Sequence, residues 1–178
     1  MEGSVLSPQN PKKKTCPCPD VNLEDWRDNT LVFRLKPFLV RTIPRFLWIP
    51  IALREEIVAI YARAAALRLK LAAPAMVLEQ EGGLFRGRIL LAINEEAGFP
   101  DRLLLTGLYR TAVHRGSAVR LGVTRRRLVA RLKRELGVTP GEIYYWYVNC
   151  PKCWHTSGGQ AVVILARVGS PPAEETSR

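Results

Sequence analysis

The stretch that decides the fold is AMVLEQEGGLFRGRILLAI, residues 75–93, in which two apolar segments flank the turn Glu81-Gly82-Gly83. Glycine adopts the positive φ angles that tight hairpin turns need. Residues 75–80 and 84–93 are therefore predicted to form two antiparallel strands joined by this turn. The hairpin indicates that the core is built on an antiparallel sheet.

Two helices are predicted, one before and one after this hairpin. Apolar residues recur at helical spacing from Leu53 to Leu71, so the first helix is expected at about 51–72. The second is expected at about 124–136, capped by Thr124 and closed by Gly137. Both helices would pack on the sheet.

Further strands are expected at 31–40, where Pro37 favours a sheet edge, and at 143–148 and 160–168. Residues 102–116 fit a strand or a helix equally well. The two last strands would form a hairpin with a long tip. The sequence thus predicts an α+β fold with a mainly antiparallel sheet of four to six strands and two principal helices.

The domain limits follow from composition. Residues 1–15 are expected to be a flexible basic tail, 16–168 a single α+β domain and 169–178 a disordered tail. No signal peptide is recognised, and no uninterrupted apolar run reaches the roughly 20 residues of a membrane span. A cytoplasmic location is therefore expected.

The four cysteines lie in two tight pairs, Cys16 with Cys18 and Cys150 with Cys153. Such spacing lets both thiolates of a pair bind one ion, and two pairs supply the four ligands of a tetrahedral structural zinc. This four-cysteine site would tie the N-terminal arm to the tip of the C-terminal hairpin. An iron–sulfur cluster, or a redox or disulfide role for the cysteines, remains an alternative.

The positive charge is concentrated in one segment. The whole chain has a net charge of +11, and ten of its 27 lysines and arginines lie in the segment from Arg102 to Arg134. This segment contains no aspartate or glutamate. A cationic face of this kind attracts polyanions. We therefore predict a zinc-stapled, basic protein that binds nucleic acid through arginines of this segment: Arg110, Arg115, Arg120, Arg125, Arg126, Arg127, Arg131 and Arg134. The alternative is an arginine-rich helix face exposed to solvent.

Part of this segment carries a local motif. Ala118 precedes the glycine Gly122 by four positions, Thr124 can cap the helix that follows, and Leu128 and Leu132 can pack inward. In these features residues 117–137 resemble the helix-turn-helix of Fis-type and arabinose-regulator-type DNA-binding proteins. The resemblance implies that the helix contacts DNA through four of its arginines: Arg125, Arg126, Arg127 and Arg131.

Two further functions are kept open. Arg110 and His114, with Arg88, could hold an anionic small molecule in an enzyme or ligand-binding domain. Alternatively, the cysteines could be the working site of a metal- or redox-handling accessory protein. The apolar segment 43–51 either covers the sheet, forms an interface between copies of the chain, or docks at a membrane surface.

Overall fold

The computed structural model describes residues 19, 21–47, 49–80, 82–94, 98–149 and 159–172. Strands dominate this part of the chain. The elements, in chain order, are η2 (Leu23–Trp26), β1 (Thr30–Phe46), β2 (Ile49–Pro50), α1 (Leu53–Ala66), β3 (Val77–Gln80), β4 (Arg86–Ala92), β5 (Arg102–Gly116), η3 (Ala118–Arg120), α2 (Leu121–Leu136), β6 (Ile143–Tyr147) and β7 (Gln160–Gly169).

Six of the strands close into an antiparallel barrel. Their order is β1-β4-β3-β6-β7-β5, and β5 pairs back with β1, while β2 pairs only with the end of β1. The predicted fold class, an α+β sheet with two helices and a cysteine tie, is therefore wrong. The four cysteines lie outside the described residues.

Closure depends on the length and the bend of β1. Its first part, Thr30 to Leu39, pairs with β5, and its later part, Phe38 to Pro44, pairs with β4. The register shifts between Phe33 and Lys36, and Leu35 has a positive φ of 48°. Such a bulge bends a strand and increases its twist, so one strand can turn from one side of the barrel to the other.

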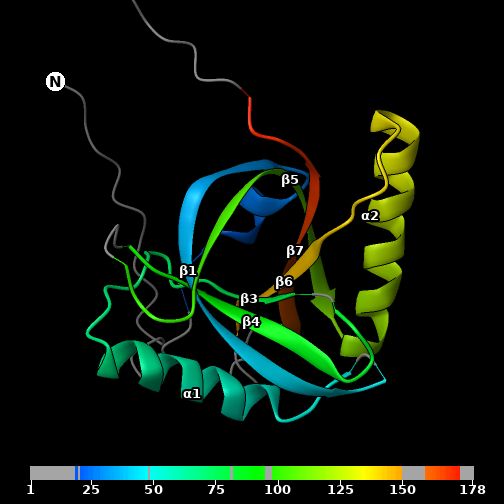
Figure 1. Ribbon diagram of the computed structural model, residues 1–178. Coiled ribbons are helices and arrows are strands. Elements are labelled where there is room, and N and C mark those ends of the chain that lie inside the picture. Colours follow the sequence, from blue (N-terminus) through cyan, green and yellow to red (C-terminus); the bar gives the residue numbers. More distant parts are fainter. Residues whose placement is uncertain are drawn as a thin grey trace, which may run out of the picture.

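The apolar residues form three clusters that follow from strand alternation. Inward-facing side chains such as Phe38, Leu78 and Trp146 fill the barrel. Outward-facing residues of β1, β3 and β4 pack against α1, and those of β5, β6 and β7 pack against α2. Figure 1 shows α1 beneath the barrel and α2 along its right side. The two helices thus cover different parts of the outer barrel surface.

Several predicted elements are found with altered ends. The 75–93 hairpin is present as β3 and β4, and residues 102–116 form a strand, β5. The first helix ends at Ala66, well before residue 72, because Arg68 has a positive φ of 54°. The second begins at Leu121, before Thr124, and ends at Gly137, whose φ is 68°. Pro37 does not lie at a sheet edge. It is paired with Leu104 of β5 on one side, and on the other side its carbonyl accepts the N–H of Ile93, which follows β4, at 3.0 Å.

Within the described ranges, neither helix is long and apolar enough to cross a membrane. The long helices α1 and α2 contain 14 and 16 residues.

Candidate active site

A buried ion pair joins β1 to β3 on the outer surface of the barrel. The Nη2 of Arg45 donates a hydrogen bond to Oε1 of Glu79, and each side chain is only 3% exposed. Glu79 follows Val77 on the outward face of β3, where its neighbours are the apolar residues that meet α1. Charged groups are rarely buried this deeply unless they are paired or functional.

Tyr147 of β6 completes the cluster. Its hydroxyl donates a hydrogen bond of 2.7 Å to Oε2 of Glu79, so each carboxylate oxygen has a different partner. Burial, and then the charge of Glu79 and the hydrogen bond to it, raise the pKa of Tyr147 well above its ordinary value. The phenol therefore stays protonated and remains a hydrogen-bond donor at neutral pH.

The room for the Arg45 guanidinium comes from a missing side chain on β4. A Cβ added to Gly87 would lie 2.7 Å from both Cδ and Nε of Arg45. Nη1 of Arg45 faces the hairpin turn, 3.7 Å from where a Cβ of Gly82 would be. The two glycines thus form a slot that admits the guanidinium group and directs it along β3 toward Glu79.

The guanidinium group is only partly satisfied. Within the described residues, Nε and Nη1 of Arg45 are buried and have no hydrogen-bond partner. A buried donor without an acceptor costs about 1–3 kcal/mol, and more when it is charged. Two charged N–H groups of Arg45 are therefore left without an acceptor among the described residues.

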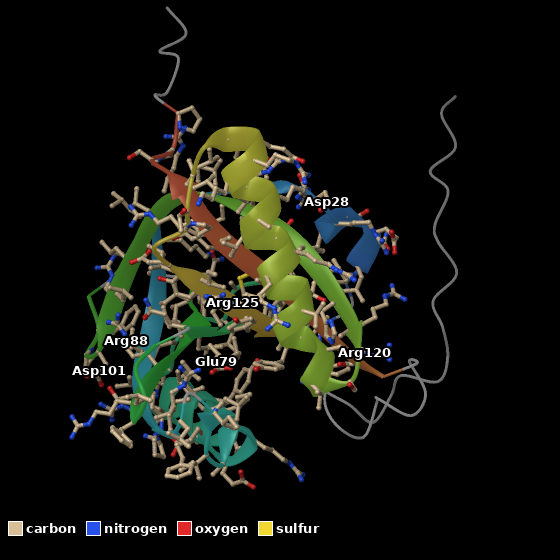
Figure 2. All side chains as sticks on the ribbon, turned by 90° about the vertical axis from the view of Figure 1, so that its right-hand side faces the viewer. Asp28, Glu79, Arg88, Asp101, Arg120 and Arg125 are labelled. Carbon is tan, nitrogen blue, oxygen red and sulfur yellow. The ribbon has the colours of Figure 1, made fainter. Side chains whose placement is uncertain are left out.

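The cluster lies between the two helices. Figure 2 shows Glu79 above α1 and beside the lower half of α2. On the α2 side its neighbours are aromatic: Glu79 is paired in register with Tyr145, and Tyr145 and Tyr147 belong to the cluster that packs against α2. A carboxylate, a partly satisfied guanidinium and a phenol thus converge at one point on the barrel surface.

The strand ladder brings these residues together from distant parts of the sequence. Sequence reasoning singled out none of Arg45, Glu79 and Tyr147 as a site residue. The available signal was a charged residue at position 79 in a strand whose other outward residue, Val77, is buried. A second signal was Gly87 within the predicted strand 84–93, because a glycine inside a strand often marks close approach by another group.

The residues that the sequence did propose as sites lie elsewhere and do not share one pocket. His114 is buried and links β5 to α2: its Nε2 donates to the carbonyl of Ser117 at 3.0 Å, and its Nδ1 lies 2.9 Å from Oγ1 of Thr124. Because a carbonyl only accepts, the neutral ring accepts the Thr124 hydroxyl at Nδ1. Arg88 instead lines an open cleft near the start of β5.

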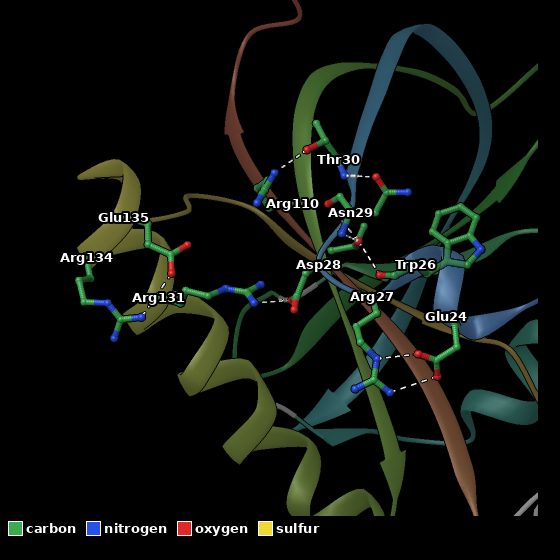
Figure 3. A network of polar contacts seen from close by, with 11 residues as sticks. Glu24, Trp26, Arg27, Asp28, Asn29, Thr30, Arg110, Arg131, Arg134 and Glu135 are labelled. Carbon is green, nitrogen blue, oxygen red and sulfur yellow. Dashed lines mark hydrogen bonds and ion pairs between the residues drawn. The ribbon is translucent and has the colours of Figure 1, made fainter.

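Three of the predicted anion-binding arginines contact the segment before β1 or the first residue of β1. Arg131 pairs with Asp28, and Arg110 donates to Oγ1 of Thr30 at 2.6 Å (Figure 3). Arg115 lies 3.7 Å from Glu24. These contacts hold the N-terminal segment against β5 and α2. They show that part of the charge in 102–134 is matched by acidic groups from outside that segment.

The other arginines of this set are spread around α2. Arg134 pairs with Glu135 at 3.3 Å, Arg126 and Arg127 are exposed, and Arg120 is exposed in η3. Arg125 is half-buried and makes an interaction of its own. Most of the predicted set thus lies on or next to α2, and its role in anion binding stays a prediction.

Comparison with known proteins identifies a family and a fold. A family model described as "Bacterial hydrolase" matches residues 8–168. The C-terminal domain of EcmrR, a solved structure, has a TM-score of 0.56 and 12% sequence identity, and the alignment covers 80% of this chain and 98% of that domain. At this identity the likeness concerns the fold alone. No curated protein gives a significant match.

These findings correct the helix-turn-helix interpretation. The matched family is a hydrolase family and not a Fis-type or arabinose-regulator-type DNA-binding family. The structure gives the physical reason: residues 102–116 form a strand, and Gly122 lies inside α2 instead of in a turn between two helices. Leu128 and Leu132 do pack inward, but against the barrel.

The predicted function as a zinc-stapled nucleic-acid-binding protein is likewise wrong. The family match indicates an enzyme, and among the residues that the structure describes no group of three or more His, Cys, Asp or Glu is placed to hold a metal ion. Cys16, Cys18, Cys150 and Cys153 lie outside those residues. A zinc ion or an iron–sulfur cluster on the cysteines stays a prediction about the cofactor.

Proposed function

Because the chain belongs to the bacterial hydrolase family, we propose that it is a hydrolase whose reaction takes place at Glu79, Arg45 and Tyr147. The observation that carries the proposal is the buried carboxylate of Glu79, held by one charged and one neutral donor beside two unsatisfied N–H groups of Arg45. Hydrolysis needs a base for water and a donor for developing negative charge. This cluster offers both.

Glu79 is proposed as the general base. Arg45 and Tyr147 fix the two oxygens of its side chain, and a carboxylate held in this way can accept a proton from water. The side chain is 3% exposed, so a substrate carbon has poor access to its oxygens, whereas a water molecule is small enough to reach them. We therefore favour attack by water over a covalent intermediate on Glu79.

In the proposed step, Glu79 takes one proton from water as the water oxygen forms a bond to an electrophilic carbon of the substrate. The bond from that carbon to the leaving group breaks, and Glu79 returns the proton to the leaving group. Atoms and charges balance without a cofactor. General acid–base catalysis of this kind contributes about 10²–10⁴-fold in rate.

Arg45 is proposed to stabilise the oxygen that gains negative charge. Its Nε and Nη1 lack acceptors among the described residues, and because they are as buried as Glu79, a substrate oxygen is proposed to reach them only when the side chains around the cluster move apart. Donors fixed in a water-poor site stabilise a transition state without having to reorganise. A purely structural ion pair would be expected to satisfy these donors within the protein.

Tyr147 is proposed as a positioning residue. Its hydroxyl fixes Oε2 of Glu79 at 2.7 Å, and its raised pKa keeps the proton on the phenol. Replacement by phenylalanine removes this hydrogen bond and leaves the ring. The Tyr147→Phe variant is therefore expected to lower turnover more than it changes substrate affinity.

The experiment is a screen of chromogenic carboxylic esters, lactones and epoxides with the full chain and with Glu79→Gln. The expected result is hydrolysis of at least one class by the wild type and a loss of about 100-fold or more in Glu79→Gln. Glu142→Gln is the matched control, because Glu142 also pairs with an arginine, Arg167 at 3.3 Å, but is 37% exposed. Equal turnover in Glu79→Gln and Glu142→Gln would overturn the proposed role.

A further inference from the structure

We propose that a second site, separate from the Arg45–Glu79–Tyr147 cluster, binds a phosphate dianion, either free or as part of a small molecule. The site is an open cleft with a volume of about 540 Å³. Its lining residues include four arginines, Arg41, Arg63, Arg88 and Arg102, together with Asp101 and Thr42. Arg45, Glu79 and Tyr147 are not among them, so the site goes beyond the proposed function.

The barrel topology explains why the cleft exists. The β5 strand begins at Arg102, which is paired with Leu39 of β1, and the pairing of β1 with β2 begins only at Arg45. Between these points one side of β1 has no strand partner among the described residues, although β4 continues on the other side. The cleft lies over this interruption and gathers arginines from α1 and from three strands: β1, β4 and β5.

Charge complementarity identifies the ligand class. Arg41 is paired with Glu56, and Arg63 lies 3.9 Å from Asp101, so two carboxylates face four guanidinium groups. Arg102 lies over the ring of Phe99 at 5.9 Å. Two positive charges are thus left unmatched by the carboxylates described around the cleft, and a phosphate dianion would neutralise both.

The number of arginines around the cleft favours phosphate over a single carboxylate. Guanidinium groups donate in pairs to the oxygens of a phosphate, and several of them can bind different oxygens of one group. Thr42 also lines the cleft. The volume falls within the roughly 300–1,000 Å³ of typical small-molecule sites. Figure 2 shows Arg88 and Asp101 on the same side of the molecule, away from Arg120.

The test measures binding by calorimetry at about pH 8, where phosphate is a dianion, with added chloride to suppress diffuse attraction. The titrants are inorganic phosphate, phenyl phosphate and acetate. Saturable binding of inorganic phosphate or phenyl phosphate is expected, with acetate much weaker. Tighter binding of phenyl phosphate would identify a phosphate ester as the ligand, and equal binding would identify free phosphate.

The variants locate the binding. Arg88→Ala and Arg102→Ala, both at exposed positions, are each expected to weaken phosphate binding at least about tenfold, since each removes a hydrogen-bond donor to a charged group. Arg127→Ala removes the same charge from an exposed position of α2 and is the control. The proposal fails if no saturable binding occurs, if acetate binds as tightly as phosphate, or if Arg127→Ala weakens binding as much as Arg88→Ala does.

Discussion

Substitution of Gly87 by alanine tests the slot that holds Arg45. The added Cβ would lie 2.7 Å from Cδ and Nε of Arg45, whereas ordinary contacts between carbon atoms are about 3.5–4.0 Å. Arg45 would therefore have to retreat by roughly 1 Å. Because its side chain is 3% exposed and paired with Glu79, this movement strains the ion pair.

The expected loss of stability comes from overpacking. Inserting a group into a filled site costs typically about 1–3 kcal/mol, less than the roughly 3–5 kcal/mol for removing one partner of a buried ion pair. For a protein of this size, each kcal/mol lowers the melting temperature by about 2–4 °C. Turnover is expected to fall by about 100-fold, since a misplacement of about 1 Å has that effect on catalysis.

The control is Gly83→Ala in the same hairpin. A Cβ at Gly83 would meet only the carbonyl oxygen of Arg86, at 3.9 Å, which is an ordinary contact. Urea unfolding gives the free energy of unfolding of both variants, and initial rates on the substrate found in the screen give their turnover. If Gly87→Ala matched Gly83→Ala in both measurements, the slot would not position Arg45 as described.

Three further predictions concern other parts of the chain. Burial, and then the charge of Glu142, raise the pKa of Tyr109 to about 12. The stability that the protonated phenol contributes is therefore present below pH 10 and is lost as the pH rises through about 12. In Tyr109→Phe the free energy of unfolding should fall less steeply between pH 10 and about 12. Metal analysis of untagged protein should find one zinc per chain, and its loss in a Cys150→Ser variant would assign the ion to the cysteines, whereas metal-free protein would refute the prediction of a four-cysteine site. Ile49, 68% exposed in β2, lies in the segment 43–51, for which an interface between copies is one of three alternatives; on that alternative Ile49→Asp should shift an oligomer toward monomer in sedimentation experiments, and identical sedimentation of both proteins would count against it.

The local elements of the fold could be predicted from the sequence because their signals are local. The turn between β3 and β4 and the apolar spacing along α1 each depend on neighbouring residues, although neither Gly82 nor Gly83 has the positive φ that the turn was expected to need. The closure of the barrel could not be predicted in this way. It depends on one strand, β1, pairing with both β4 and β5, and on a bulge at Leu35, where the sequence has no glycine or asparagine to indicate a positive φ.

The candidate site could not be predicted because its parts are separated in the sequence and joined by strand register. Arg45 lies 34 positions from Glu79, and Tyr147 lies 68 positions from it. The abundance of arginine in 102–134 led to the prediction of an anion-binding surface, but three of those arginines pair with acidic or polar groups of residues 24–30. A single buried glutamate on a strand was the more informative residue.

The most direct test of the proposed chemistry is a single turnover in water enriched in ¹⁸O, with enzyme in excess over the substrate found in the screen. Direct attack by a water molecule that Glu79 activates places one solvent oxygen in the product and leaves the Glu79 carboxylate unlabelled. Mass spectrometry of the product and of the peptide that contains Glu79 measures both. An unlabelled product, with ¹⁸O in the Glu79 carboxylate instead, would show that Glu79 attacks the substrate itself and would contradict its assignment as the general base.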